Sequence, residues 1–225
     1  MGLLTAIRSQ IGYNQTTVSA QQRPQEFQFD LSGGHLALDF ANTISRRDSP
    51  DKTKEHLNRY HDLIAFAQQT SLITPQEADG LLRRADAQRR QAGQSLRAAI
   101  TLREAIFTAF LALAHAKPAS PYDIGYLEKA ASDALRHRHI VRANGGYEWR
   151  WDGEPMLEKI LWPIAMSAAE LLTSAELAKV RECEARDCYW LFLDHSRNHS
   201  RRWCTMSACG NREKARRHYQ RQRSE

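Results

Sequence analysis

All four cysteines of this 225-residue chain lie in its C-terminal part, and their spacing constrains the fold more than any other feature. Each of two pairs encloses four residues, and fifteen residues separate the pairs, which are Cys183, Cys188, Cys204 and Cys209. Zinc binds four cysteine sulphurs at the corners of a tetrahedron, and two close pairs of cysteines joined by a short segment can supply that geometry. We therefore predict one structural Zn²⁺. Four cysteine ligands leave no open coordination position, so we expect no catalysis by the metal.

Three alternatives to this site stay open. The cysteines could form a redox dithiol pair, or they could be buried thiols without a metal. His195 or His199 could replace one cysteine as a ligand, because imidazole also binds zinc. Both histidines lie in a polar turn, however, and a complete set of four cysteines favours contact of the histidines with solvent or phosphate.

The compartment follows from two further observations. The opening residues lack the basic segment of a secretion signal, and no apolar run approaches the ~18 residues of a membrane span. We therefore expect a cytoplasmic protein without membrane contact, in which clustered cysteines bind a metal rather than form disulfides.

The positive charge of the chain is concentrated at one end. The net charge is +6, but residues 195–225 hold nine of the 32 Lys and Arg residues and only two of the 26 Asp and Glu residues. This segment therefore carries +7 and the rest of the chain −1. Such an asymmetry is typical of proteins that bind nucleic acid or another anionic surface.

The residues between and after the cysteines predict a treble-clef-like zinc module. Residues 189–194 are expected to form a strand, 195–199 a turn and 200–203 a return strand that pairs with the first. Residues 210–223 are expected to form a terminal helix whose first turn supplies the last ligand. On that helix Ala215 and Tyr219 share a stripe, which we expect to pack on the module.

The remaining sides of the terminal helix are basic. At 100° per residue, Arg212, Arg216 and Arg223 share one side, while Lys214, Arg217 and Arg221 share another. The turn and return strand add Arg197, Arg201 and Arg202. A zinc-anchored scaffold with these cations suits phosphate contact, which supplies affinity without specifying sequence. The alternative is a solvated helix that only aids solubility.

Upstream of the zinc module we expect an α+β body, mainly helical with two β-hairpins. A composition of 42% hydrophobic and 26% charged residues is ordinary for a globular chain and excludes general disorder. The hairpins are predicted at 27–40 and at 139–151, with Asn144-Gly145-Gly146 at the second turn. Helices are predicted from 57 to about 71, from Thr74 to about Gly93, from 95 to Pro118, from 120 to about 136, and over 156–172 with a bend or delayed start at Pro163.

The body offers weak candidates for other sites. Asp39 could line a small-molecule pocket with His35, or with Asn42 and Arg46, but we favour Asp39 and Asn42 as residues that bond backbone groups at a strand end. Trp149, Trp151 and Trp162 are expected to pack in the core or hairpin. No Ser-His-Asp or Cys-His arrangement is evident, so we do not expect an enzyme.

Several motifs in the chain resemble those of a known family. The C-terminal motif Cys209-Gly210-Asn211-Arg212, with Phe192-Leu193-Asp194 and Arg201-Arg202-Trp203-Cys204 before it, resembles the bacterial CGNR zinc-finger proteins. The stretch from Gly34 to Thr43 resembles the ABATE domain that precedes this finger. The division we expect is a weakly ordered segment at 1–24, an ABATE-like body at 25–178 and a CGNR zinc finger at 179–225.

The resemblance implies a stress-linked transcription regulator with a zinc-bound, DNA-binding C-terminus. It also implies that Asn211 ties the backbone of the knuckle and that Arg212 faces phosphate or base. We expect DNA as the partner, a small-molecule effector for the body and a homodimer. The alternatives are a protein that binds RNA or a ribonucleoprotein, or an enzyme docked through its finger. The residues expected to contact nucleic acid are Arg197, Arg201, Arg202, Asn211, Arg212, Lys214, Arg216, Arg217 and Arg221.

Overall fold

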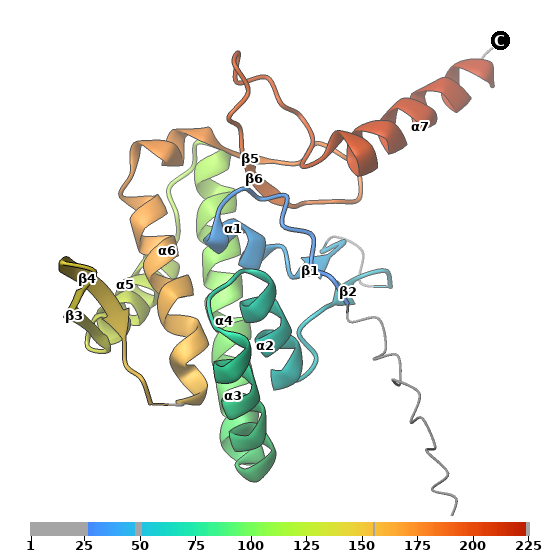
Figure 1. Cartoon of the computed structure of the whole chain (residues 1–225). Coiled ribbons are helices and arrows are strands. Elements are labelled where there is room, and N and C mark those ends of the chain that lie inside the picture. The colour runs from blue at the N-terminus through green and yellow to red at the C-terminus, as the bar shows by residue number, and fades with distance from the viewer. Residues whose placement is uncertain (1–26, 48–50, 155, 224–225) are drawn as a thin grey trace, which may run out of the picture.

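The computed structural model of the chain describes residues 27–47, 51–154 and 156–223, so the weakly ordered segment predicted for 1–24 lies outside the described residues. The longest helix, α4 (Arg89–Ala114), runs through the centre of the molecule (Figure 1). On one side of it lie α2 (Tyr60–Gln69) and α3 (Pro75–Ala87), and on the other α5 (Pro121–Leu135) and α6 (Leu161–Leu172). With its small antiparallel sheets and C-terminal cysteine cluster, the molecule has the predicted α+β fold.

Helices α3 and α5 begin where the sequence predicts, because their starting signals are local. The Thr74 side chain accepts a hydrogen bond from the backbone N–H of Glu77, and the Glu77 carboxylate accepts one from the Thr74 N–H at 2.8 Å. This is the expected capping box. The Ser120 side chain caps α5 by accepting a hydrogen bond from the N–H of Tyr122, with Pro121 in the first helical position.

The predicted helix break at Gly93 is wrong. The chain leaves helical geometry at Gln88, which has φ −123° and ψ 52°, and α4 then continues through Gly93. Glycine costs only about 1 kcal/mol inside a helix, and the buried residues Ala99, Leu102, Ile106 and Phe110 of the same helix offset that cost.

The first predicted hairpin, over residues 27–40, is also wrong. Residues 27–31 form no regular element, and Leu36–Ala41 form helix α1, five of whose six residues are buried. A short run of mostly apolar residues is compatible with a buried helix as well as with a buried strand. The Gln69 side chain replaces a partner strand: its amide oxygen accepts from the Phe29 N–H at 2.8 Å and its amide nitrogen donates to the Phe29 carbonyl at 2.6 Å.

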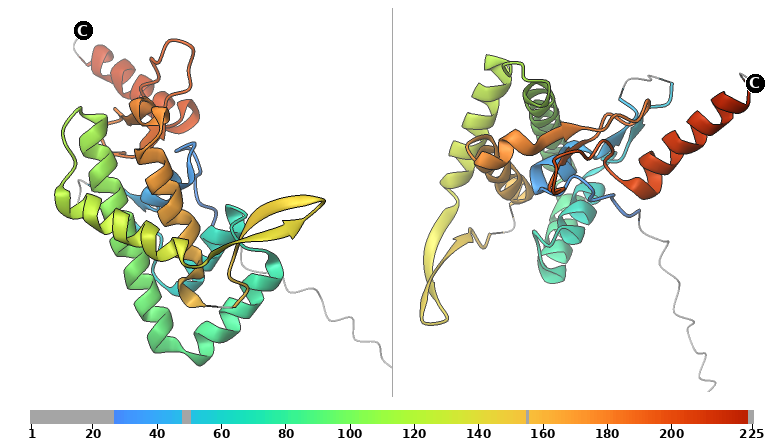
Figure 2. Two further views of the ribbon diagram at one scale, coloured as in Figure 1. Left: turned by 90° about the vertical axis from the view of Figure 1, so that its left-hand side faces the viewer. Right: turned by 90° about the horizontal axis from the view of Figure 1, so that it is seen from above.

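The second predicted hairpin is confirmed. Strands β3 (Arg138–Ala143) and β4 (Gly146–Trp151) pair antiparallel, and Asn144 and Gly145 form the turn with φ of 49° and 80°. These positive angles are what a two-residue hairpin turn requires. The hairpin projects from the helices (Figure 2), so Trp149 is 55% exposed and packs within the hairpin, where the Arg138 guanidinium lies 5.1 Å from its ring centroid.

The delayed start predicted for the core helix is confirmed. Residues Leu157–Ile160 form a short 3₁₀ helix, η1, and α6 begins only at Leu161, two residues before Pro163. Proline lacks the N–H that an interior helical position needs, so it is tolerated only in the first turn. Trp162 is buried as expected and stacks on the His137 ring, with 4.0 Å between ring centroids.

A two-stranded sheet joins the zinc segment to the body. Strand β5 (Val180–Glu182) pairs antiparallel with β6 (Leu191–Leu193). Side chains alternate along β6: Leu191 and Leu193 belong to the body core, whereas Phe192 packs in the cysteine cluster. Val180 also lies in the body core. Strand β6 therefore lies between two separate packed clusters, the body core on one face and the cysteine cluster on the other.

Candidate metal centre and nucleic-acid interface

The four cysteine sulphur atoms converge at the base of the terminal helix. All four lie within 4.8 Å of one another, and all four residues are buried. The Sγ atoms of Cys188 and Cys204 are 3.6 Å apart, and those of Cys204 and Cys209 are 3.5 Å apart. Zinc–sulphur bonds of about 2.3 Å in a tetrahedron place sulphurs about 3.8 Å apart. The cluster therefore fits one structural Zn²⁺.

Ionisation of all four thiols requires a positive charge beside them. Hydrogen bonds with Cys188, Cys204 and Cys209 lower the pKa of Cys183, whereas hydrogen bonds with the three other cysteines and burial raise the pKa of Cys188. Four buried thiolates at this spacing repel one another, so they can all ionise only around a cation. Zn²⁺ supplies that charge and binds the thiolate form.

Local backbone bonds position each ligand. Cys183 directly follows β5, and its N–H extends the ladder by donating to the Trp190 carbonyl at 2.8 Å. Cys188 ends a turn, and its N–H donates to the Ala185 carbonyl. The Cys204 N–H donates to the Cys183 Sγ at 3.3 Å. Cys209 lies in the π-helical turn Met206–Gly210, which leads directly into the terminal helix α7 (Asn211–Gln222).

The predicted return strand at 200–203 is wrong, because β6 pairs with β5 instead. Asp194 organises residues 195–203 as a loop: one carboxylate oxygen accepts from the Ser196 N–H at 2.9 Å and the other from the Arg201 N–H at 3.0 Å. His199 Nδ1 lies 3.1 Å from the Asp194 carbonyl, and His195 lies 3.4 Å from Glu176. Both histidines therefore have partners other than the cysteine cluster.

Arg201 is a scaffold residue, which sequence reasoning did not foresee. Its guanidinium lies over the Phe192 ring, 4.4 Å from the centroid. It donates to four backbone carbonyls, those of Ser32, Leu193, Trp203 and Cys204. Five N–H groups in a rigid fork suit arginine to this task. The side chain thereby joins the finger loop, β6 and the first turn of the body.

The side of α7 that faces the zinc module is charged, so the predicted packing of Ala215 and Tyr219 is wrong. Both residues are exposed. Arg216 instead pairs with Asp187 at 3.3 Å and with Glu213 at 2.8 Å. Arg212 donates to the Cys209 Sγ at 3.4 Å. The knuckle between Cys183 and Cys188 presents the Asp187 carboxylate, and that charge selects the arginine side of the helix.

The first two residues after Cys209 stabilise the turn that holds it. A Cβ on Gly210 would lie 2.5 Å from the Met206 Sδ and 3.3 Å from the Trp203 ring, so only glycine fits without displacing them. The Asn211 side chain donates to the Ser207 carbonyl at 3.3 Å. This bond ties Asn211 to the backbone of the turn between Cys204 and Cys209.

The outer side of α7 is basic and accessible. Lys214, Arg217 and Arg221 lie within about 60° on this side, all are exposed, and none forms an ion pair with a described residue. Figures 1 and 2 show α7 extending away from the body. Arg197 is exposed in the loop, and Arg202 forms an exposed pair with Glu184 at 2.5 Å.

Asp39 and Asn42 bond backbone groups as predicted, although they do so from a helix. Asp39 Oδ1 accepts from the Gly33 N–H at 2.8 Å. The Asn42 amide bonds both backbone groups of Leu191 in β6. The Trp190 indole N–H donates to the Ile44 carbonyl at 2.9 Å, and the Leu193 N–H donates to the Gly33 carbonyl. These bonds fix the finger on the body.

Comparison with known families matches both halves of the described molecule. Residues 34–175 match the ABATE family model, described as "Putative stress-induced transcription regulator", and residues 179–222 match the CGNR zinc finger. No curated protein matches the chain. Neither family description names an enzyme. Within the described ranges, no helix is both long and apolar enough to cross a membrane.

Proposed function

Because the chain belongs to the ABATE family and ends in a CGNR zinc finger, we propose that it is a transcription regulator that binds duplex DNA through the outer side of α7. The zinc centre holds the base of α7, and the ABATE body holds the zinc centre. In this assignment the metal is structural, since four cysteines complete its coordination.

The observation that carries the proposal is the division of the basic residues into two sets. Arg201, Arg212 and Arg216 bond carbonyl groups, a ligand sulphur and carboxylates inside the molecule. Lys214, Arg217 and Arg221 face outward on one side of α7. A guanidinium held by bonds inside the fold is less available to a phosphate than an exposed cation without an ion pair, so the second set provides the contacts.

Arg202 of the loop extends this surface beyond the helix. The Arg202 guanidinium lies 5.4 Å from the Trp203 ring centroid, and the Arg217 guanidinium lies 6.0 Å from the same ring. Loop and helix therefore present adjacent cations around one aromatic side chain. The Arg202–Glu184 pair is exposed and is worth at most about 1 kcal/mol, so a phosphate can replace the carboxylate.

The shape of α7 supports a duplex as the partner. Its twelve residues span about 18 Å at 1.5 Å per residue. The major groove of B-DNA is about 12 Å wide and admits one α-helix. A projecting helix can enter that groove without contact between the DNA and the body, and we assign the body the role of effector or partner domain.

The experiment measures binding of the full-length, zinc-loaded protein to a random-sequence duplex at several salt concentrations. Log K should fall linearly with log salt, by about 0.9 for each phosphate contact. The triple variant Lys214→Gln, Arg217→Gln, Arg221→Gln should bind more weakly and lose up to about 2.7 from that slope. A slope equal to that of the unmodified protein would overturn the assignment of these contacts.

The matched control removes the same charge from the far end of the body. Arg83, Arg84 and Arg89 are exposed on α3 and at the start of α4, and their triple Gln variant should keep the full slope. A structured RNA serves as competitor. Displacement of the duplex by RNA at lower concentration than by unlabelled duplex would replace DNA with RNA as the partner.

A further inference from the structure

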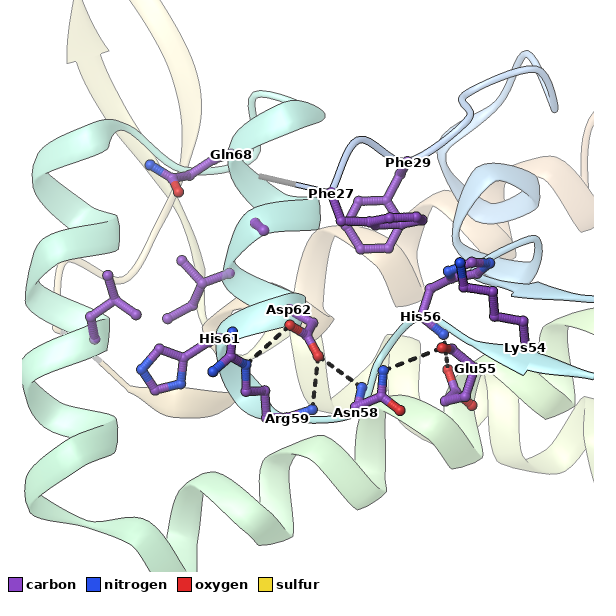
Figure 3. Close-up of a pocket in the computed structure, with 13 residues that line it drawn as sticks. Phe27, Phe29, Lys54, Glu55, His56, Asn58, Arg59, His61, Asp62 and Gln68 are labelled. Atoms are coloured by element: carbon purple, nitrogen blue, oxygen red, sulfur yellow. Dashed lines mark hydrogen bonds and ion pairs between the residues drawn. The ribbon is translucent and has the colours of Figure 1, made fainter. Parts of the chain in front are cut away.

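A cavity of about 590 Å³ lies in the body, away from the zinc centre. Figure 3 shows its walls, which are the segment at Phe27 and Phe29, strand β2 (Lys54–Glu55) with the loop after it, and one side of α2. This volume lies within the range of small-molecule sites, which is about 300–1,000 Å³. Neither the metal nor the basic surface of α7 uses this cavity.

Aromatic groups form one wall of the cavity. The Phe27 ring is 49% exposed and stacks on the His56 ring, with centroids 4.6 Å apart and an angle of 14° between planes. It also meets Phe29 edge to face at 5.1 Å. Ala65 and Leu82 add apolar surface from α2 and α3. A flat apolar group can bury its faces here.

Both carboxylates that line the cavity are committed to internal partners. Glu55 accepts two hydrogen bonds from the buried Arg103 guanidinium, at 2.6 and 2.8 Å. Asp62 accepts from the backbone N–H groups of Asn58 and Arg59 at 2.9 and 3.0 Å, as the dashed lines in Figure 3 show for this residue. Arg103 therefore neutralises the charge of Glu55, and the Asp62 carboxylate caps the start of α2.

The cations at the rim are less constrained. No carboxylate of the described residues lies within ion-pair distance of Lys54, whose ammonium is 5.7 Å from the Phe27 centroid. The Arg59 side chain is exposed, and its guanidinium meets the Asp62 carboxylate through Nε at 3.4 Å. The mouth of the cavity thus presents cationic donors beside an aromatic wall, and this combination selects a ligand with a ring and a negative charge.

We propose that this cavity binds a small aromatic acid. The ring of the ligand lies against Phe27 and the apolar surface of α2, and its carboxylate pairs with Lys54. The ligand replaces water at the ammonium with a charge-assisted bond, while Arg59 adds positive potential at the other end of the cavity.

The walls of the cavity connect to the zinc module by hydrogen bonds. Strand β2 pairs with β1 (Ile44–Ser45), in which Ile44 lies opposite Glu55. The Ile44 carbonyl accepts from the Trp190 indole, two residues from the zinc ligand Cys188. A ligand that shifts β2 therefore acts on the finger within two hydrogen-bonded steps. The description of this ligand as an effector rests on the proposed regulatory function, whereas binding itself does not.

The test is a ¹H–¹⁵N NMR titration of the full-length, zinc-loaded protein with trans-cinnamate and with trans-cinnamamide, which share a ring and differ in charge. Cinnamate should bind about tenfold more tightly, since a hydrogen bond to a charged group contributes roughly 1.5 kcal/mol or more. It should also shift the Trp190 indole resonance, assigned with Trp190→Phe. Equal affinity for acid and amide would overturn the proposal, and binding without the indole shift would overturn the connection to the finger.

Two variants separate the contributions of charge and ring. Lys54→Gln should lower cinnamate affinity to that of cinnamamide, while Lys52→Gln, an exposed neighbour outside the cavity, should keep the tenfold preference. Phe27→Ala should weaken both probes equally. If Lys54→Gln behaves as Lys52→Gln does, the acid site is excluded. None of these measurements uses DNA, so their failure is distinct from failure of the proposed function.

Discussion

The side chain of Asn42 forms the two backbone hydrogen bonds of Leu191 that a neighbouring strand would form, although Leu191 lies 149 positions further along the chain. The Asn42 amide nitrogen donates to the Leu191 carbonyl at 2.8 Å, and the Leu191 N–H donates to the Asn42 amide oxygen at 3.0 Å. Both residues are buried. One side chain therefore satisfies both backbone groups of a residue in β6, the strand that carries the body core on one face and the cysteine cluster on the other.

Asn42→Ala should lower the free energy of unfolding by about 2–4 kcal/mol, because it leaves two buried backbone groups unpaired. Urea unfolding followed by circular dichroism measures the change. The variant should also release zinc faster to a chelator, since β6 loses its attachment to the body. Asn198→Ala, in the exposed finger loop, serves as the control and should change stability by less than about 0.5 kcal/mol. An Asn42→Ala protein as stable as this control would contradict the role assigned to the amide.

Removal of zinc should destabilise the body as well as the finger. Val180, Leu191 and Leu193 belong to the body core, and the metal holds the strands that carry them. Zinc binding is worth about 10–16 kcal/mol in small zinc modules, so part of this free energy should stabilise the body core through strands β5 and β6. Thermal unfolding with and without chelator should show a lower midpoint for the helical signal, which is restored by added Zn²⁺. A helical transition that does not move would show that the body folds without the finger.

Arg201→Gln should impair the fold rather than the contact with DNA. The substitution removes donors to four backbone carbonyls and should lower the free energy of unfolding by roughly 2–4 kcal/mol. The salt slope of DNA binding, measured where the variant remains folded, should stay unchanged because its guanidinium faces inward. Arg197→Gln, in the same loop but exposed, should leave stability unchanged. A stable Arg201→Gln protein with a reduced salt slope would place this residue at the DNA instead.

Asp39 should make the protein less stable as the pH rises. Burial raises the pKa of Asp39 from 3.8 to about 7, against the hydrogen bond from the Gly33 N–H. The folded state therefore holds a proton that the unfolded state loses above about pH 4. Between about pH 4 and pH 7 the unfolded state binds fewer protons, so stability falls by as much as about 4 kcal/mol.

Asp39→Asn isolates this contribution, because an amide oxygen still accepts from the Gly33 N–H and carries no charge. Urea unfolding at pH 5 and pH 8 should show that the variant gains stability relative to the unmodified protein as the pH rises. Other carboxylates contribute equally to both proteins and cancel in the difference. A difference independent of pH would mean that Asp39 titrates at its ordinary value.

The parts of the fold that could be predicted depend on neighbours close in the sequence. The capping box at Thr74, the delayed helix at Pro163 and the hairpin turn at Asn144-Gly145 each follow from a few adjacent residues. Residues 36–41 and 200–203 could not be assigned in this way. Their partners are α6, Asp194 and distant carbonyls, and a strand pattern does not reveal them.

The sequence by itself predicted the four cysteines as zinc ligands, because two close pairs of cysteines are typical of a tetrahedral zinc site. It also determined that the terminal segment is basic and helical. Only the tertiary structure decided which cations are free. Arg216 pairs with Asp187 of the knuckle, and Arg201 donates to the carbonyl of Ser32, which is far from it in the sequence. Lys214 forms no ion pair with a described residue. A charge pattern counts the cations, but their availability depends on acceptors that only the folded chain brings near.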